Sequence, residues 1–173
     1  SLAKLLVDKI KKPSDTVKYR DVSIGLPFVS GIKGAGFIIP ENERTEADKK
    51  LFKISDELVK EFKECDTLVI SAPIYNFGVP ACLKAWFDLI ARNGETFNYT
   101  DKGPVGIITN IKKAYLLIVS GGVPVNSSMD FCTPWLKQAL NFLGVNNIEI
   151  IAADSLNRDP QKIEKTKEKI NSL

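Results

Sequence analysis

Two short loops carry the residue types in this sequence that could hold a ligand. The first, Pro73-Ile-Tyr-Asn-Phe77, combines two aromatic rings with an amide, and the second, Ser120-Gly-Gly-Val123, is a glycine turn. Aromatic side chains offer flat surfaces, and glycine lets the backbone approach a ligand closely. Both loops are therefore candidates for contact with a ligand.

Side chains that act as acids, bases or metal ligands are scarce by comparison. The sequence has no histidine, which removes the commonest general base, the Ser-His and Cys-His dyads and a versatile zinc ligand. Tyr75 and Asp88 are possible proton donors, but water can supply protons equally well. We therefore assign no catalytic acid or base and no metal site, and we expect the chemistry to depend on a cofactor.

Apolar runs immediately before the two loops predict the strands that position them. Thr67–Ala72 and Ala114–Val119 are nearly continuous in apolar residues, which is typical of strands buried on both faces of a parallel sheet. Asn147–Ala153 predicts another strand, and Thr16–Val22 alternates with period two, which predicts an outer strand. Ligands of open α/β sheets bind where such strands end.

Amphipathic segments between these strands predict helices. Apolar residues recur at helical spacing over five segments, namely 2–10, 45–64, 81–92, 131–142 and 160–170. Gly94 and Gly144 follow two of them, as expected where helices end. Because strands and helices alternate, the pattern predicts a doubly wound parallel α/β sheet.

Two segments do not fit this alternation. Thr96–Thr109 predicts short extended pieces with a turn at Asp101–Gly103. Ser23–Arg44 is rich in glycine and proline and is long for a connection in a compact domain. It could cover a site or contact a partner, and a mobile surface loop is an equal alternative.

Composition places the chain among single-domain proteins without a nucleic-acid or membrane partner. Its 173 residues, 44% of them hydrophobic, suffice for one domain, residues 1–173. The net charge is +3 with both signs interspersed, which is typical of a solvated surface. Three widely spaced cysteines and the lack of a membrane span or signal-peptide pattern favour a reduced, cytoplasmic location.

The residues around the two loops resemble a known family. The segments Pro73–Pro80, Leu83–Asp88, Ala91–Thr100 and Ser120–Val123 are similar, in register, to the FMN-dependent NADH azoreductases of the flavodoxin-like quinone reductase superfamily. The resemblance covers roughly residues 45–155, which makes it far more specific than one glycine motif. It implies a flavodoxin-like sheet of five parallel strands in the order 2-1-3-4-5.

The resemblance implies that FMN is the bound cofactor and that both loops contact it. The residues carried over as cofactor contacts are Pro73, Ile74, Tyr75, Asn76, Phe77, Ser120, Gly121, Gly122 and Val123. Tyr99 matches an aromatic residue that borders the substrate cleft in the family, with an ordinary core or surface position as an equal alternative. Many relatives have a basic residue between the serine and the glycines, and this chain lacks it.

The implied function is that of an oxidoreductase. NADH or NADPH would reduce FMN by hydride transfer, and an azo compound or quinone would then take two electrons in a ping-pong cycle. One alternative is a flavodoxin-type electron carrier, although such carriers tend to be acidic and this chain is not. Another is acyl-carrier-protein phosphodiesterase, a label that family members have carried, although no cluster of metal ligands is visible.

The resemblance also implies a homodimer, with long helices beside the flavin forming the interface. Trp86, Phe87, Phe131 and Trp135 would then lie in the core or between subunits. The strands found match the second to fifth of the family, and the first, central strand has no candidate. We expect about 15 to 20 further residues before Ser1, enough for one strand and one phosphate-binding loop.

Overall fold

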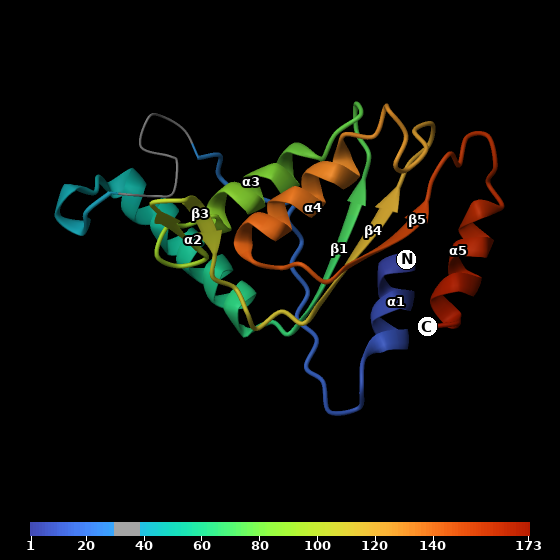
Figure 1. Ribbon diagram of the computed structural model, residues 1–173, viewed down its shortest axis with the longest axis horizontal. Helices are drawn as coiled ribbons and strands as arrows, with labels where there is room; N and C mark the ends of the chain where they lie inside the picture. The colour runs from blue at the N-terminus through green and yellow to red at the C-terminus, as the bar shows by residue number, and fades with distance from the viewer. Residues whose placement is uncertain (30–38) are drawn as a thin grey trace.

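Three parallel strands form the central sheet of the protein. The computed structural model describes residues 1–29 and 39–173. The strands lie side by side in the order β1 (Thr67–Pro73), β4 (Lys113–Val119) and β5 (Ile148–Ala153) (Figure 1). Their last residues are in register, so all three strands end at the same edge of the sheet. This order is the one predicted for the third, fourth and fifth strands.

Helices cover both faces of this sheet. One face carries α1 (Leu2–Ile10) and α5 (Lys162–Asn171), which lie beside each other (Figure 1). The other carries α3 (Ala81–Ile90) and α4 (Cys132–Leu143), and α2 (Glu46–Glu64) packs against α3. In the part of the chain that the structure describes, no helix is both long and apolar enough to cross a membrane.

The apolar run of β4 is largely buried because both faces of the sheet are covered there, whereas β1 lies at the end of the strand order and exposes Thr67 and Ser71. Leu117 packs with Leu6, Ile151 and Ile170 under α1 and α5. Leu116, the residue before it, belongs to the larger core under α2, α3 and α4. Successive residues of a strand point to opposite faces, so a strand covered on both sides needs apolar residues throughout.

The remaining elements are short. A 3₁₀ turn, η2, spans Glu41–Glu43. The strands β2 (Phe97–Thr100) and β3 (Gly103–Gly106) pair antiparallel, as the expected extended pieces and turn require. All five predicted helices are present, and their ends lie within two residues of the expected positions.

The strand predicted at Thr16–Val22 is wrong, because residues 16–21 have no regular secondary structure or sheet pairing and Val22 lies in a turn. Arg20 binds Glu61 and Glu57 of α2 instead, and Lys18 lies 3.3 Å from Glu61. Tyr19 is 67% exposed. An alternating sequence becomes a strand only where a neighbouring strand accepts its hydrogen bonds, and the segment contacts a helix here.

The Ser23–Arg44 segment is described only in part. Residues 30–38 lie outside the described residues, so the choice between a cover, a partner contact and a mobile loop stays a prediction there. At its start, Leu26 and Val29 are half-buried against the larger core. At its end, Ile39 belongs to that core, and the Arg44 guanidinium stacks on the Phe52 ring at 3.6 Å. Both ends are thus anchored on the same side of the sheet.

Candidate functional site

The two loops predicted to bind a ligand lie next to each other. Ile74 N–H donates to the carbonyl of Val119 at 2.8 Å, which continues the β1–β4 pairing beyond the end of β1. Residues 74–77 and 120–123 therefore leave the sheet from adjacent strands at the same edge (Figure 1). This is the edge at which open α/β sheets bind ligands.

The first loop is a tight turn with a strained backbone. Tyr75 and Gly78 exchange two backbone hydrogen bonds of 3.0 Å, which closes the turn. The residues between them, Asn76 and Phe77, have φ values of +47° and +70°. Asparagine tolerates this left-handed region, but a bulky residue such as phenylalanine rarely adopts it. Such strain costs on the order of 1–3 kcal/mol and is found mostly at functional sites.

Exposed apolar side chains surround this turn. Tyr75 is 62% exposed, Phe77 53% and Phe131 64%. Phe131 comes from the loop before α4, and its N–H donates to the Phe77 carbonyl at 2.9 Å. The side chains therefore belong to one region, which can contact an aromatic ligand. The sequence placed Phe131 only in the core or a dimer interface; its position just before a helix at this edge was the missed signal.

The glycine turn is held from within by its serine. Ser120 is 4% exposed, and its hydroxyl donates to the Val123 carbonyl and accepts from Ser155 N–H. Its backbone N–H donates to Ala153 of β5. The Ser120 side chain is thus occupied in fixing the turn, and Gly122 within the turn is exposed.

The two glycines meet different surroundings. A Cβ on Gly121 would come within 2.9 Å of the Asn157 side chain, whereas a Cβ on Gly122 would meet no protein atom within 4 Å. Within the described residues, the backbone N–H groups of Gly121, Gly122 and Asn76 have no hydrogen-bond partner. Free donors, open space at Gly122 and exposed rings are what a planar, polar-edged cofactor such as a flavin requires, so the site fits one.

The remaining predicted contacts have simpler positions. Pro73, Ile74 and Val123 are half-buried at the base of the loops. Asn76 is exposed, and its side-chain amide has no hydrogen-bond partner among the described residues. Eight of the nine residues predicted as cofactor contacts thus belong to the two adjacent loops, and Pro73 is the last residue of β1, directly before the first loop. Their contact with FMN stays a prediction.

Tyr99 is not brought to these loops within one chain. It lies on β2, 57% exposed, with its ring edge against Phe97 at 5.2 Å between centroids. Its N–H faces Asn93, just beyond the end of α3, whereas the first loop precedes the start of α3. The ten residues of that helix span about 15 Å at 1.5 Å per residue. The β2–β3 hairpin accordingly lies away from the carboxyl ends of β1 and β4 (Figure 1).

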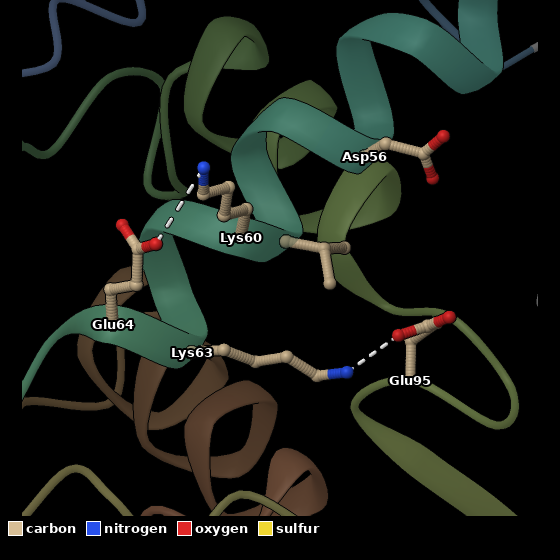
Figure 2. Close-up of a pocket in the computed structure, with 6 residues that line it drawn as sticks. Asp56, Lys60, Lys63, Glu64 and Glu95 are labelled. Carbon is tan, nitrogen blue, oxygen red and sulfur yellow. Dashed lines mark hydrogen bonds and ion pairs between the residues drawn. The ribbon is translucent and has the colours of Figure 1, made fainter.

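A surface pocket on α2 offers no comparable site. Figure 2 shows it lined by Asp56, Lys60, Lys63, Glu64 and Glu95. Lys63 pairs with Glu95 at 2.5 Å, Lys60 with Glu64 at 3.8 Å, and Asp56 binds Arg92. The charges thus neutralise one another. Among the described residues, no group of three or more His, Cys, Asp or Glu could hold a metal ion.

Comparison with protein families matches residues 1–173 to the family described as having a flavodoxin-like fold. The chain belongs to this flavodoxin-like family. The match confirms both the α/β fold class and the resemblance that the sequence suggested. It also agrees with the position of the two loops, because flavodoxin-like sheets bind their flavin at the carboxyl edge.

Individual relatives in the flavodoxin-like family carry enzyme names. An FMN-dependent NADH:quinone oxidoreductase of Pelagibacter ubique is 53% identical over 170 residues, covering 98% of this chain and 88% of that protein. A second, from Hahella chejuensis, is 44% identical and covers 94% of this chain and 80% of that protein. Among solved structures, the azoreductase from Bacillus anthracis str. Sterne is 26% identical with a TM-score of 0.81, covering 99% of this chain and 88% of that one.

Proposed function

We propose that this protein is an FMN-dependent NADH:quinone oxidoreductase that also accepts azo compounds. The single observation that carries the proposal is the pair of adjacent loops, 74–77 and 120–123, with free backbone donors and exposed aromatic rings at the carboxyl edge of the sheet. Relatives of 53% and 44% identity are named for this activity.

The chain's own residues would bind and orient the cofactor. Backbone N–H groups of Asn76, Gly121 and Gly122 would donate to polar atoms of FMN, and the rings of Tyr75 and Phe77 would lie against apolar surface. FMN, when bound, supplies the hydride acceptance and the two-electron transfer. The protein's contribution is binding, orientation and exclusion of water, and no side chain is assigned as an acid or base.

We base the choice of electron donor and acceptor on the names of the relatives. Their names specify NADH and a quinone, and the solved relative from Bacillus anthracis is an azoreductase. We propose NADH in preference to NADPH, and quinones as the first acceptors to test. Free Cys65, Cys82 and Cys132 support a reducing, cytoplasmic location, and the family match over residues 1–173 supports a single domain.

We further propose that the enzyme works as a homodimer in which Tyr99 acts on the partner's site. Within one chain Tyr99 lies about one helix length from the loops, so we assign it to the site of a second copy. The exposed rings of Phe131 and Phe77, together with half-buried Trp135, offer apolar surface for that contact.

The decisive experiment measures flavin binding and turnover together. Purified protein incubated with FMN and desalted should keep visible flavin absorbance and should consume NADH only when a quinone is present. A protein that retains no flavin and releases phosphopantetheine from acyl carrier protein would overturn the proposal. Flavin retention without NADH consumption would instead favour the electron carrier.

Gly122→Ala gives a matched test of where FMN binds. The added methyl group meets no protein atom within 4 Å, so stability should stay within about 0.5 kcal/mol of the wild type. FMN affinity should fall about tenfold, because the methyl group occupies the space beside the free N–H groups. Unchanged affinity in a fluorescence titration would exclude the glycine turn from the FMN site.

A further inference from the structure

Asp154 links the glycine turn to two other parts of the chain. It directly follows β5, and its side chain is 13% exposed. One carboxylate oxygen accepts from Val125 N–H at 2.5 Å, just beyond the glycine turn. The other accepts from the Lys162 ammonium at 2.5 Å, at the first residue of α5. A single carboxylate therefore ties the exit of the turn to the start of a helix.

Backbone hydrogen bonds from the residues after Asp154 hold the entrance of the same turn. Leu156 N–H donates to the Ser120 carbonyl at 3.1 Å, and Asn157 N–H donates to the Gly121 carbonyl at 2.8 Å. Ser155 N–H donates to the Ser120 hydroxyl at 3.3 Å. Residues 154–157 thus bind the turn at both ends. Of these hydrogen bonds, the one to Val125 is made by a side chain of residues 154–157, and the others are made by their backbone N–H groups.

The charge of Asp154 makes this contact strong. Burial raises the pKa of Asp154, but the hydrogen bonds from Lys162 and Val125 outweigh it, so the pKa lies below its ordinary value. The carboxylate is therefore ionised at neutral pH. Hydrogen bonds to an ionised acceptor are roughly twice as strong as those between neutral groups.

We infer that Asp154 is a positioning residue for the cofactor: its carboxylate, held by Lys162, fixes residues 120–125 so that Gly121 and Gly122 present their N–H groups to FMN. The inference rests on the proposed function and adds a residue that does not itself contact the cofactor. Two consecutive glycines have the largest backbone freedom of any pair. Without the contact at Val125, binding would have to order them, which lowers affinity.

The test compares Asp154→Asn with Asp159→Asn. In Asp154→Asn the amide can still accept from Val125 N–H, but its NH₂ group then faces the Lys162 ammonium, donor against donor. Asp159→Asn removes the same charge five residues later, where the carboxylate accepts from Gln161 N–H and pairs with Lys165. The control thus leaves the glycine turn untouched.

We expect FMN affinity to fall about tenfold in Asp154→Asn, equivalent to about 1.4 kcal/mol, and to stay unchanged in Asp159→Asn. Amide hydrogen exchange of Val125, whose N–H donates to the Asp154 carboxylate, should accelerate in the FMN-free variant. Exchange of Leu116 and Leu117 in the core of β4 should not, which separates local loosening from global unfolding. The double variant Asp154→Asn/Lys162→Gln should recover part of the affinity, because the glutamine oxygen can accept from the asparagine.

Two failures can be told apart. Wild-type protein that binds no FMN would overturn the proposed function, while exchange of the Val125 amide in the FMN-free variants would still decide whether Asp154 holds the turn. Unchanged exchange in Asp154→Asn, or FMN affinity equal to that of Asp159→Asn, would overturn the positioning role.

Discussion

At the scale of single residues, the most informative feature is the left-handed backbone of Phe77. Glycine or asparagine would adopt φ of +70° at little cost, yet the chain places a half-exposed phenylalanine there. Its carbonyl is held by Phe131 N–H, so the conformation is fixed by its surroundings. A strained residue that contributes little burial is best explained by a ligand that needs its ring.

Phe77→Gly should therefore separate stability from binding. Relief of strain on the order of 1 kcal/mol should offset the loss of a half-exposed ring, so the FMN-free protein should be no less stable in urea. FMN affinity should fall at least about fivefold, measured by fluorescence quenching. Asn76→Gly, which keeps the turn and removes the neighbouring amide, tests that side chain separately and should also weaken binding. Affinities unchanged in both variants would remove the turn from the site.

Cys132 provides a second prediction at this scale. The residue is fully buried, and burial together with the charge of Asp130 raises the pKa of its thiol to about 12. Because only the thiolate reacts, iodoacetamide at pH 8 should leave Cys132 unmodified in the folded protein. Mass spectrometry should show its alkylation only as urea unfolds the chain. Modification in native buffer at the rate of half-buried Cys82 would contradict this burial.

At the scale of elements, the strands show what a sequence can predict and where it stops. Thr67–Ala72 and Ala114–Val119 were predicted correctly as strands because a short apolar run rich in β-branched residues and followed by a glycine or proline turn is typical of a strand in a parallel sheet. The strand prediction at Thr16–Val22 failed because alternating polar and apolar residues indicate which side chains face solvent, not whether a partner strand is present. A local sequence pattern thus predicts well which residues are buried, but it predicts poorly which strands pair with each other.

In the candidate site, too, some residues could be predicted from the sequence and others could not. The loops at 74–77 and 120–123 were found from motif residues that are contiguous in the chain. Asp154 was missed because its contact with Val125 joins residues 29 positions apart, through the parallel pairing of β4 and β5. A carboxylate directly after a strand, at the edge where ligands bind, was the available signal.

The packing of the β2–β3 hairpin against α4 leads to a stability prediction. A Cβ on Gly106 would lie 2.2 Å from the backbone of Gly144, which ends α4 with φ of +103°. Gly106→Ala must therefore push the hairpin away from α4 and should cost about 2 kcal/mol or more in urea unfolding. Gly122→Ala, in open space, is the matched control. Equal stability of the two variants would show that Gly106 does not pack closely against Gly144 in solution.

At the scale of the whole molecule, the charge pattern predicts how stability depends on pH. The chain has no histidine, so no side chain with an ordinary pKa between pH 5 and 8 contributes. Burial raises the pKa of Glu61, but hydrogen bonds from Arg20 and Lys18 outweigh it, and the pKa lies below its ordinary value, as does that of Asp154.

A carboxyl group whose pKa is lowered by folding stabilises the protein above its unfolded pKa, and the stabilisation is lost as pH falls through the folded value. We expect an unfolding free energy that is flat from about pH 6 to 8 and declines below about pH 4. Glu61→Gln should make the acid decline shallower. Glu57→Gln, at a glutamate 62% exposed, should change it less. A stability maximum near pH 4 would contradict this assignment.

The assembly can be tested directly, because the proposed site needs two copies of the chain. Consider one variant with a damaged loop, Gly122→Ala, and another that lacks the distant ring, Tyr99→Ala. If Tyr99 serves the partner's site, a mixed dimer has one site with both changes and one with neither. Unfolding and refolding the two variants together should then give NADH:quinone activity above the mean of the separate proteins. If Tyr99 acts within its own chain, every mixed site carries one change and the activity stays at that mean. Light scattering of the same samples should report a dimer at micromolar concentration, and a fully active monomer would exclude the shared site altogether.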